Sequence, residues 1–399
     1  MTATNMQAFR LAPESTGTGV HLPQETLSFA LSDEGTLTGG LRFSFQLRCG
    51  TGSPIANPFD AAGADQISLS QFAGANAVIS RLWIQSDATG EILYAENDWQ
   101  RTSAVLTAVG FSAAGESLGS KACQSLTTYS PWVAQNLVRT SNNDASSRAV
   151  SIALHDVVDM LRQDLPLNLL QLRIYIQLAP AAAAFYSAVN PATAAATFEI
   201  TQPYLEGYIL RGADMTSATI SFTRLETLSQ VVSSQNATIN MSASNSAACI
   251  GALVSFCPTA SMNNLTADQS VLATPTGGVN SVSYRLGGLQ SVLSFDVLPY
   301  VVNGTDNFVE AIDFALQLFA GINGAKTTLT GDRASSNILL NRPNYFLLGV
   351  PFGSPTDLRR TQFSLQITTG ILSANPFLCY VSFISRATLQ LGASAGARK

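Results

Sequence analysis

Apolar and polar residues alternate along much of the chain, which is the period of a half-buried β-strand. The alternation runs through residues 41–49 and is most regular in residues 170–178. Residues 77–84 and 91–94 are two further strand candidates, and the Ser, Asp and Gly of residues 86–90 between them favour a hairpin turn. The first half of the chain is therefore predicted to contain antiparallel strands.

The second half repeats this pattern. Its strand candidates are residues 218–223, 250–256, 282–286, 345–350 and 363–367. Residues 197–210 lie at the midpoint of the chain, and residues 377–389 lie close to its end. We predict that these two stretches are equivalent, each being the last strand of one of two units. Pro203 then belongs at a strand edge or a kink, and the two units abut rigidly.

Three short helices interrupt the strands. Residues 99–109 are predicted to form the first, with Asn97 or Asp98 as its cap and Gly110 at its end. Residues 155–165 are the second, because Leu154, Val157, Val158 and Leu161 have the spacing of one helical face and Pro166 follows. Residues 307–320 are the third. We expect the second and third to lie in loops on corresponding sides of the two units.

The 399 residues are too many for one hydrophobic core, so two domains are expected. Many short strands with few helices favour an all-β fold of two tandem eight-stranded antiparallel jelly rolls with short loop helices. The predicted boundaries are residues 1–22 for an N-terminal arm, 23–205 for the first jelly roll, 206–392 for the second, and 393–399 for a C-terminal tail.

The composition restricts the classes of function that the chain can have. Only 12% of the residues are charged, which suits a molecule whose surface is largely covered by other protein. The net charge of −5 gives no basic field for nucleic acid, so no sequence-specific nucleic-acid partner is expected. The N-terminal stretch lacks the apolar region of a signal peptide, and no stretch is apolar for long enough to span a membrane.

The chain offers little for catalysis or metal binding. Its five cysteines are scattered without a Cys-x-x-Cys, and His21 and His155 are its only histidines. Four pairs of acids are candidates for glycoside hydrolysis. They are Asp33 with Glu34, Glu96 with Asp98, Asp156 with Asp159, and Glu310 with Asp313. Because they fall at turns, helix starts and exposed helix faces, we predict no catalytic residue, no cofactor and no metal site.

Four stretches, taken in order, are similar to a known family. They are residues 67–76, which contain Gln-Phe-Ala-Gly-Ala-Asn, the segment 155–178, the midpoint stretch 198–205, and the terminal Tyr-Val-Ser-Phe-Ile-Ser-Arg-Ala-Thr-Leu of residues 380–389. Together they resemble the double jelly-roll major capsid proteins of the tectivirus–adenovirus lineage. In residues 67–76 an extra alanine, Ala73, separates the phenylalanine from Gly74. Residues 111–147 and 225–300 carry no resemblance.

The resemblance implies a structural protein of an icosahedral virion, made in the host cytoplasm and not an enzyme. Its partners would be two further copies in a pseudo-hexagonal trimer, neighbouring capsomers, penton and minor capsid proteins, and an internal viral membrane contacted through the N-terminal arm. Two alternatives stay open. One is a double-sandwich glycan-active hydrolase or carbohydrate-binding protein, and the other is a minor capsid or spike protein.

Overall fold

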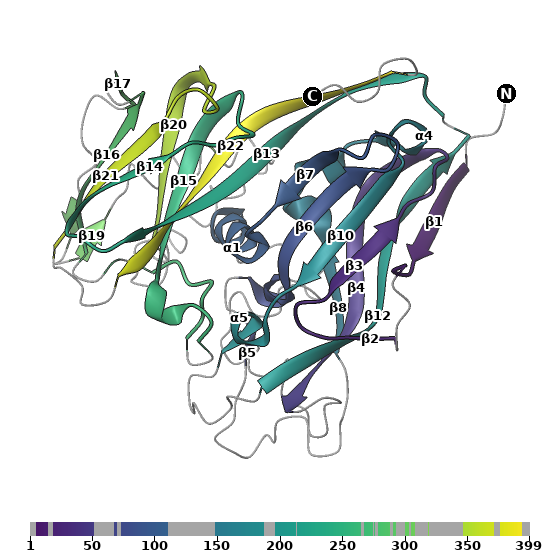
Figure 1. The fold of residues 1–399 in the computed structure, drawn as a ribbon, viewed down its shortest axis with the longest axis horizontal. Coiled ribbons are helices and arrows are strands. Elements are labelled where there is room, and N and C mark those ends of the chain that lie inside the picture. Colours follow the sequence, from purple (N-terminus) through teal and green to yellow (C-terminus); the bar gives the residue numbers. More distant parts are fainter. Residues whose placement is uncertain are drawn as a thin grey trace.

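The structure is a computed structural model, and it places two β-sheet units side by side (Figure 1). It describes residues 5–14, 19–51, 68–69, 73–110, 148–186, 196–212, 214–264, 267–273, 275, 278–287, 290–292, 300–302, 305–307, 318, 346–370 and 376–392. The first unit, residues 5–211, is called roll 1 below, and the second, residues 217–392, is called roll 2.

Roll 1 contains eight main strands in two antiparallel sheets. They are β1 (Asn5–Leu11), β3 (Thr26–Ala30), β4 (Thr36–Thr51), β6 (Ile79–Ser86), β7 (Ile92–Glu96), β8 (Arg148–Ala153), β10 (Leu172–Leu178) and β12 (Ala196–Arg211). One sheet has the order β1-β12-β4-β8, and the other has the order β3-β10-β6-β7.

Roll 2 repeats this arrangement. Its strands are β13 (Ser217–Val232), β14 (Asn236–Met241), β15 (Cys249–Pro258), β16 (Val279–Leu286), β17 (Gln290–Ser291), β20 (Leu347–Thr356), β21 (Phe363–Thr369) and β22 (Phe377–Gly392). Its sheets have the orders β13-β22-β15-β20 and β14-β21-β16-β17. In both rolls the first, eighth, third and sixth strands share one sheet, and the second, seventh, fourth and fifth share the other. The predicted tandem of two antiparallel jelly rolls is confirmed.

Short elements complete the described chain. Strands β2 (Val20–His21), β5 (Ser68–Leu69), β9 (Leu165–Pro166) and β11 (Phe185–Tyr186) belong to roll 1, and β18 (Tyr300–Val302) and β19 (Thr305–Asn307) to roll 2. The α-helices are α1 (Trp99–Gly110), α4 (Leu167–Leu170) and α5 (Ala181–Ala184). The 3-10 helices are η1 (Gly74–Val78), η2 (Leu154–Asp156), η3 (Asp159–Arg162) and η4 (Thr259–Ser261).

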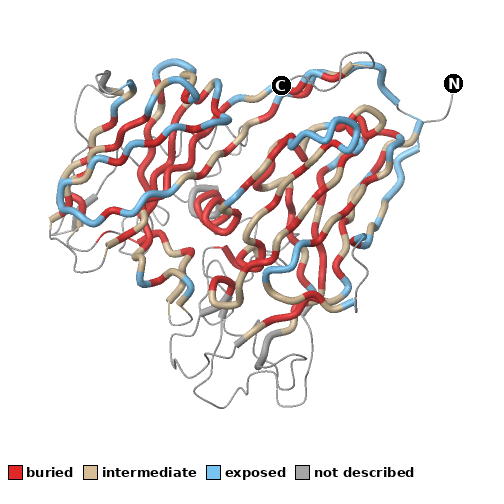
Figure 2. The backbone as a smooth tube through the Cα atoms, viewed as in Figure 1, coloured by how far each residue is buried: buried red, intermediate tan, exposed pale blue. Residues whose placement is uncertain are grey.

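Alternation along the strands directs apolar side chains inward. In β10 the even-numbered residues are buried and the odd-numbered ones are partly exposed, as the sequence pattern predicted. Ile174 pairs with Phe29 of β3 and with Ile84 of β6, and all three are fully buried. Figure 2 shows this buried interior in both rolls, with exposed residues along the outer loops and the long strand β13.

The first predicted helix is confirmed as α1, but the second is corrected. Residues 155–165 form two separate 3-10 turns, η2 and η3, with Val158 between them in an extended conformation. The carbonyl of His155 accepts a hydrogen bond from Arg162 Nε at 2.7 Å instead of continuing an α-helix. Pro166 precedes α4. Of residues 307–320, only Asn307, at the end of β19, and the helical Leu318 lie within the described part of the chain.

The midpoint and terminal stretches are the equivalent strands β12 and β22, each the eighth strand of its roll. The pairing of β12 with β4 shifts between Thr201 and Tyr204, where Gln202 has a φ of 49°. Pro203 therefore lies in a β-bulge, a position that needs no ladder hydrogen bond from its nitrogen.

Two of the expected domain boundaries disagree with the pairing and the ends of the strands. Residues 1–22 contain β1 and β2, both of which pair with β12, so this segment supplies a strand of roll 1. The boundary expected at residues 205 and 206 falls within β12, because the strand recovers its alternation after the bulge and buries Leu205 and Ile209 in roll 1. Residues 393–399 lie outside the described part of the chain.

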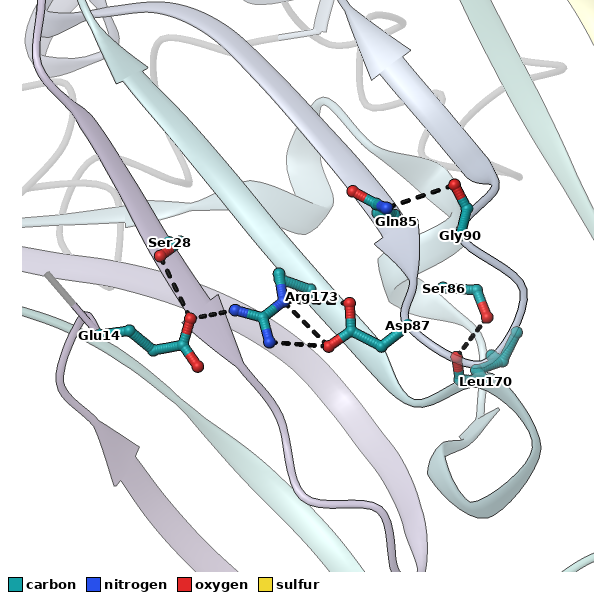
Figure 3. Close-up of polar contacts among 8 residues, drawn as sticks. All are labelled: Glu14, Ser28, Gln85, Ser86, Asp87, Gly90, Leu170 and Arg173. Carbon is teal, nitrogen blue, oxygen red and sulfur yellow. Dashed lines mark hydrogen bonds and ion pairs between the residues drawn. The ribbon is translucent and has the colours of Figure 1, made fainter.

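An exposed ion network crosses one face of roll 1 (Figure 3). The Arg173 guanidinium on β10 lies between Glu14 and Asp87 and forms ion pairs with both. Glu14 also accepts a hydrogen bond from Ser28 of β3 at 3.3 Å. The network joins the segment after β1 to the second sheet, but such exposed pairs contribute only about 0–1 kcal/mol each.

Candidate functional site

The interface between the two rolls holds the largest set of buried polar groups in the described structure, and α1 lies at its centre (Figure 1). Asp98 Oδ1 accepts a hydrogen bond from the Arg101 backbone N–H at 3.4 Å, which caps the helix. Trp99 Nε1 donates to Asn76 Oδ1 at 3.1 Å, and Gln100 Nε2 donates to the Ala77 carbonyl. These contacts fix α1 to roll 1.

Arg101 connects α1 to roll 2. Its side chain is 2% exposed, and its two terminal nitrogens donate to the carbonyl oxygens of Val271 at 2.8 Å and Gln269 at 2.9 Å. The guanidinium also lies 4.4 Å from the centre of the Tyr380 ring on β22. Burial raises the pKa of this tyrosine. A buried charge requires such partners, so Arg101 is a specific polar connection between the rolls.

A row of hydroxyl groups crosses the same interface. Thr102 Oγ1 on α1 lies 2.8 Å from Thr227 Oγ1 on β13, and Thr227 Oγ1 lies 2.9 Å from Ser382 Oγ on β22. All three residues are buried. Hydrogen bonds require directed contacts, so these hydroxyls fix the register of α1 against roll 2.

Titratable groups lie beside this row, two of them buried on β7. Tyr94 and Glu96 on β7 are nearly inaccessible, and Arg224 of β13 lies 5.7 Å from the Tyr94 ring centre. Burial raises the pKa of Glu96 to about 8, and it also raises the pKa values of Tyr94 and Asp98. Glu96 is therefore mainly protonated at neutral pH, which avoids placing an uncompensated carboxylate in the interface.

Further contacts hold the two rolls together at the connection. Asp159 Oδ2 on η3 accepts a hydrogen bond from the Thr223 backbone N–H on β13 at 2.7 Å. In the segment between the rolls, Asp214 Oδ1 accepts from the Gly35 backbone N–H at 2.8 Å, and the Met215 carbonyl accepts from Asn168 Nδ2 at 2.7 Å. The segment is thus fastened to roll 1 at residues 214 and 215.

Among the described residues, the candidate acids have different surroundings. Asp33 and Glu34 are exposed. Asp156 pairs with Arg162 at 3.2 Å, whereas Asp159 accepts a hydrogen bond from the Thr223 backbone N–H within β13. Glu310 and Asp313 lie outside the described residues.

Glu96 was expected at the start of a helix, but it belongs to strand β7. Glu96 ends β7 with 1% of its surface exposed, because roll 2 covers this edge of roll 1. A glycan substrate has no access to a carboxyl enclosed in this way.

The histidines and cysteines also have structural surroundings. His21 lies 3.1 Å from Glu25, and His155 Nδ1 lies 3.2 Å from the Leu41 carbonyl. Burial lowers the pKa of His155. The described free cysteines are all buried, namely Cys249, Cys257 and Cys379. Within the described ranges, no group of three or more His, Cys, Asp or Glu side chains is placed to hold a metal ion.

The sequence interpretation missed the polar residues that join the rolls. One signal for them was present, because the four consecutive polar residues 100–103 cover every side of the first turns of α1 and are all buried. Such a helix must have polar partners on more than one side. The partners Arg224, Thr227 and Ser382 follow ordinary strand alternation and carried no comparable signal.

None of the helices in the described part of the chain has the length and apolar character needed to cross a membrane.

Neither protein-family models nor curated proteins match this chain. Solved structures do match it along nearly its whole length. One is PBCV-1 VP54, fitted into a reconstruction of the virophage Sputnik, with a TM-score of 0.57, 12% identity, and coverage of 100% of this chain and 97% of that chain. The mavirus major capsid protein has a TM-score of 0.52, 11% identity, and coverage of 98% and 89%.

The Faustovirus major capsid protein also matches, with a TM-score of 0.52, 9% identity, and coverage of 98% of this chain and 91% of that chain. At such identities the similarity concerns the fold, and it agrees with the strand order found in each roll. The chain therefore has the double jelly-roll fold, which the major capsid proteins of mavirus and Faustovirus share with it.

Proposed function

We propose that the chain is the major capsid protein of an icosahedral virus and forms homotrimeric, pseudo-hexagonal capsomers. The observation that carries this proposal is the pair of complete jelly rolls with the same strand order, joined through buried polar contacts. Three such chains present six similar units around a threefold axis. The whole-length similarity to viral major capsid proteins supports the same function.

The role is structural, and the protein acts in the virion after synthesis in the host cytoplasm. The enclosed Glu96 and the separate partners of Asp156 and Asp159 support a non-enzymatic role. Its partners are neighbouring capsomers, penton and minor capsid proteins, and an internal membrane approached from the N-terminal end. Flotation of purified trimers with and without lipid vesicles tests the membrane contact, which is rejected if the trimers stay at the bottom of the gradient.

The decisive experiment measures the copy number of the protein in purified particles by quantitative mass spectrometry. A major capsid protein forms most of the protein mass of the shell. A few tens of copies per particle would instead identify a minor capsid or spike protein.

Light scattering on the purified protein tests the capsomer. The expected mass is about 126 kDa, three times the 42.1 kDa of the chain. A stable monomer at high protein concentration would contradict the proposal.

A further inference from the structure

Buried polar atoms without hydrogen-bond partners lie where β7 of roll 1 meets strands β13 and β22 of roll 2. They are Tyr94 Oη, Glu96 Oε2, Arg224 Nε and Ser385 Oγ, four of the nine such atoms in the described part of the chain. Tyr94, Glu96 and Ser385 are each no more than 1% exposed. Because an unpaired buried polar atom lowers stability, native proteins pair nearly all of them with protein or with water.

The strands bring these four side chains together. Tyr94 and Glu96 are alternate residues of β7, so they lie on one face of that strand. Arg224 of β13 is paired with Ser385 of β22, so these two side chains are neighbours. The Arg224 guanidinium lies 5.7 Å from the centre of the Tyr94 ring, and β7 contacts β13 directly. The two pairs of residues therefore face each other across the interface between the rolls.

Neighbouring protein groups do not complete these contacts. Glu96 Oε1 accepts a hydrogen bond from the Asp98 backbone N–H at 3.2 Å, which leaves Oε2. The Thr102 hydroxyl approaches the same carboxyl, and the Leu225 backbone approaches the Tyr94 hydroxyl. Neither contact gives Glu96 Oε2 or Tyr94 Oη a hydrogen bond of normal geometry. Both atoms are thus left for a ligand that is small enough to lie between them.

The charges around the four atoms favour a neutral ligand. Burial raises the pKa values of Tyr94 and Glu96, and the positive charge of Arg224 opposes both shifts. Asp159 adds to the shift of Tyr94, and Asp98 adds to that of Glu96, so negative charge also lies close by. The arginine disfavours a cation, and the two aspartates disfavour an anion. The Arg224 Nε–H only donates, whereas hydroxyl and carboxyl oxygens also accept, and water matches both kinds of group.

We propose that an ordered water molecule lies between the rolls and bridges Tyr94 and Glu96 of β7 to Arg224 of β13. The water accepts a hydrogen bond from Arg224 Nε–H and bonds to the Tyr94 hydroxyl and to Glu96 Oε2, and Ser385 Oγ offers it a fourth partner. Such a bridge is nearly as favourable as a direct hydrogen bond. The site adds a solvent-mediated link to the interface between the rolls, and it does not depend on the proposed capsid function.

Two tyrosine variants of the full chain test the site. Tyr94→Phe removes the hydroxyl and keeps the ring. The matched control is Tyr284→Phe, because Tyr284 is 1% exposed and its hydroxyl also lacks a partner, but it lies in the core of roll 2 beside Phe363 and Cys379. Loss of a hydroxyl that bonds to water should lower the midpoint of thermal unfolding by about 1–2 °C, whereas loss of an unpaired hydroxyl should not lower it.

We therefore expect a lower midpoint for Tyr94→Phe and an equal or higher midpoint for Tyr284→Phe, both relative to the wild type. A midpoint for Tyr94→Phe at or above that of the wild type would overturn the proposal, because its hydroxyl would then be unpaired. An equal decrease in both variants would also overturn it, because the loss would not depend on the polar surroundings of Tyr94.

A crystal structure of the wild-type protein gives the direct readout. We expect a water molecule at about 2.7–3.2 Å from Arg224 Nε and from Glu96 Oε2 or Tyr94 Oη. Well-defined side chains without density between them, or a direct contact between Glu96 and Arg224, would overturn the proposal. Crystals soaked in bromide identify an anion by its anomalous scattering, and a bromide peak at this position would overturn the assignment to water.

Discussion

Gly40 and His155 show how a single residue constrains roll 1. Gly40 has a φ of 86°, and a Cβ atom there would lie 2.7 Å from His155 Nδ1. Gly90 has a φ of 71° but open space around it. Gly90→Ala should therefore lower the free energy of unfolding by about 1–2 kcal/mol for the left-handed backbone alone. Gly40→Ala should lower it by more, because the ring must also move. Urea unfolding measures both, and equal losses would show that the ring yields without cost.

Glu96 should make the stability of the protein depend on pH. Its pKa is about 8 in the folded protein, compared with 4.5 for an ordinary, exposed glutamate. Between pH 4.5 and pH 8, the folded state therefore binds more protons than the unfolded state. The stabilisation is complete below pH 4.5 and is lost as the pH rises towards 8. Neighbouring Asp98 and Arg224 shift the midpoint but not this sign.

Glu96→Gln isolates the effect, because His155 and all other titrating groups are retained. Relative to the wild type, the variant should gain stability between pH 5 and pH 8, by an amount on the order of a few kcal/mol. Thermal unfolding at three pH values measures the difference in stability between the variant and the wild type at each pH. A difference that does not change with pH would show that Glu96 is ionised in the folded protein.

At the scale of the element, the packing of α1 against roll 2 depends on Arg101. Arg101→Met keeps most of the volume of the side chain but leaves the carbonyl oxygens of Gln269 and Val271 without their donors. We expect a loss of about 2–4 kcal/mol, since two part-buried carbonyl oxygens lose a charged partner. The control is Arg285→Met, at an exposed position on β16, which should change stability little. Equal losses from the two variants in guanidinium unfolding would contradict a special role for α1.

Strand β10 makes a second prediction at this scale. Ile174→Asp places a charge among Phe29 and Ile84 without a partner, so it should cost several kcal/mol and prevent folding. Gln177→Asp on the outward face of the same strand is the matched control and should remain soluble. Soluble expression and circular dichroism distinguish them. Normal folding of Ile174→Asp would disprove the inward orientation of the residue.

For residues 155–165, the spacing of apolar residues predicted which side chains are buried but not the type of element that they form. Their apolar stripe was correctly read as buried, because Val157, Val158 and Leu161 all lie in the core. The expected α-helix did not form, since Arg162 takes the carbonyl of His155 and Asp159 bonds to Thr223 of the other roll. Both partners come from side-chain contacts that the spacing of apolar residues does not report.

At the scale of the whole molecule, the two rolls should unfold together. The contacts of Arg101, Thr102 and Asp159 cross the interface, so one roll loses buried partners when the other opens. Calorimetry should show one transition for the wild type and two for Arg101→Met. Two transitions in the wild type would mean that the interface does not couple the rolls.

The sequence by itself determined the class of fold and its duplication. Strict alternation of apolar residues specifies a strand and its inward face locally, and the similar stretches that became β12 and β22 marked two units of the same design. Tertiary structure decided the rest. It assigned β1 to roll 1 through pairing with β12 and enclosed Glu96 between the rolls. These outcomes depend on residues far apart in the chain, whose contacts arise only when the sheets pack, and no local pattern encodes them.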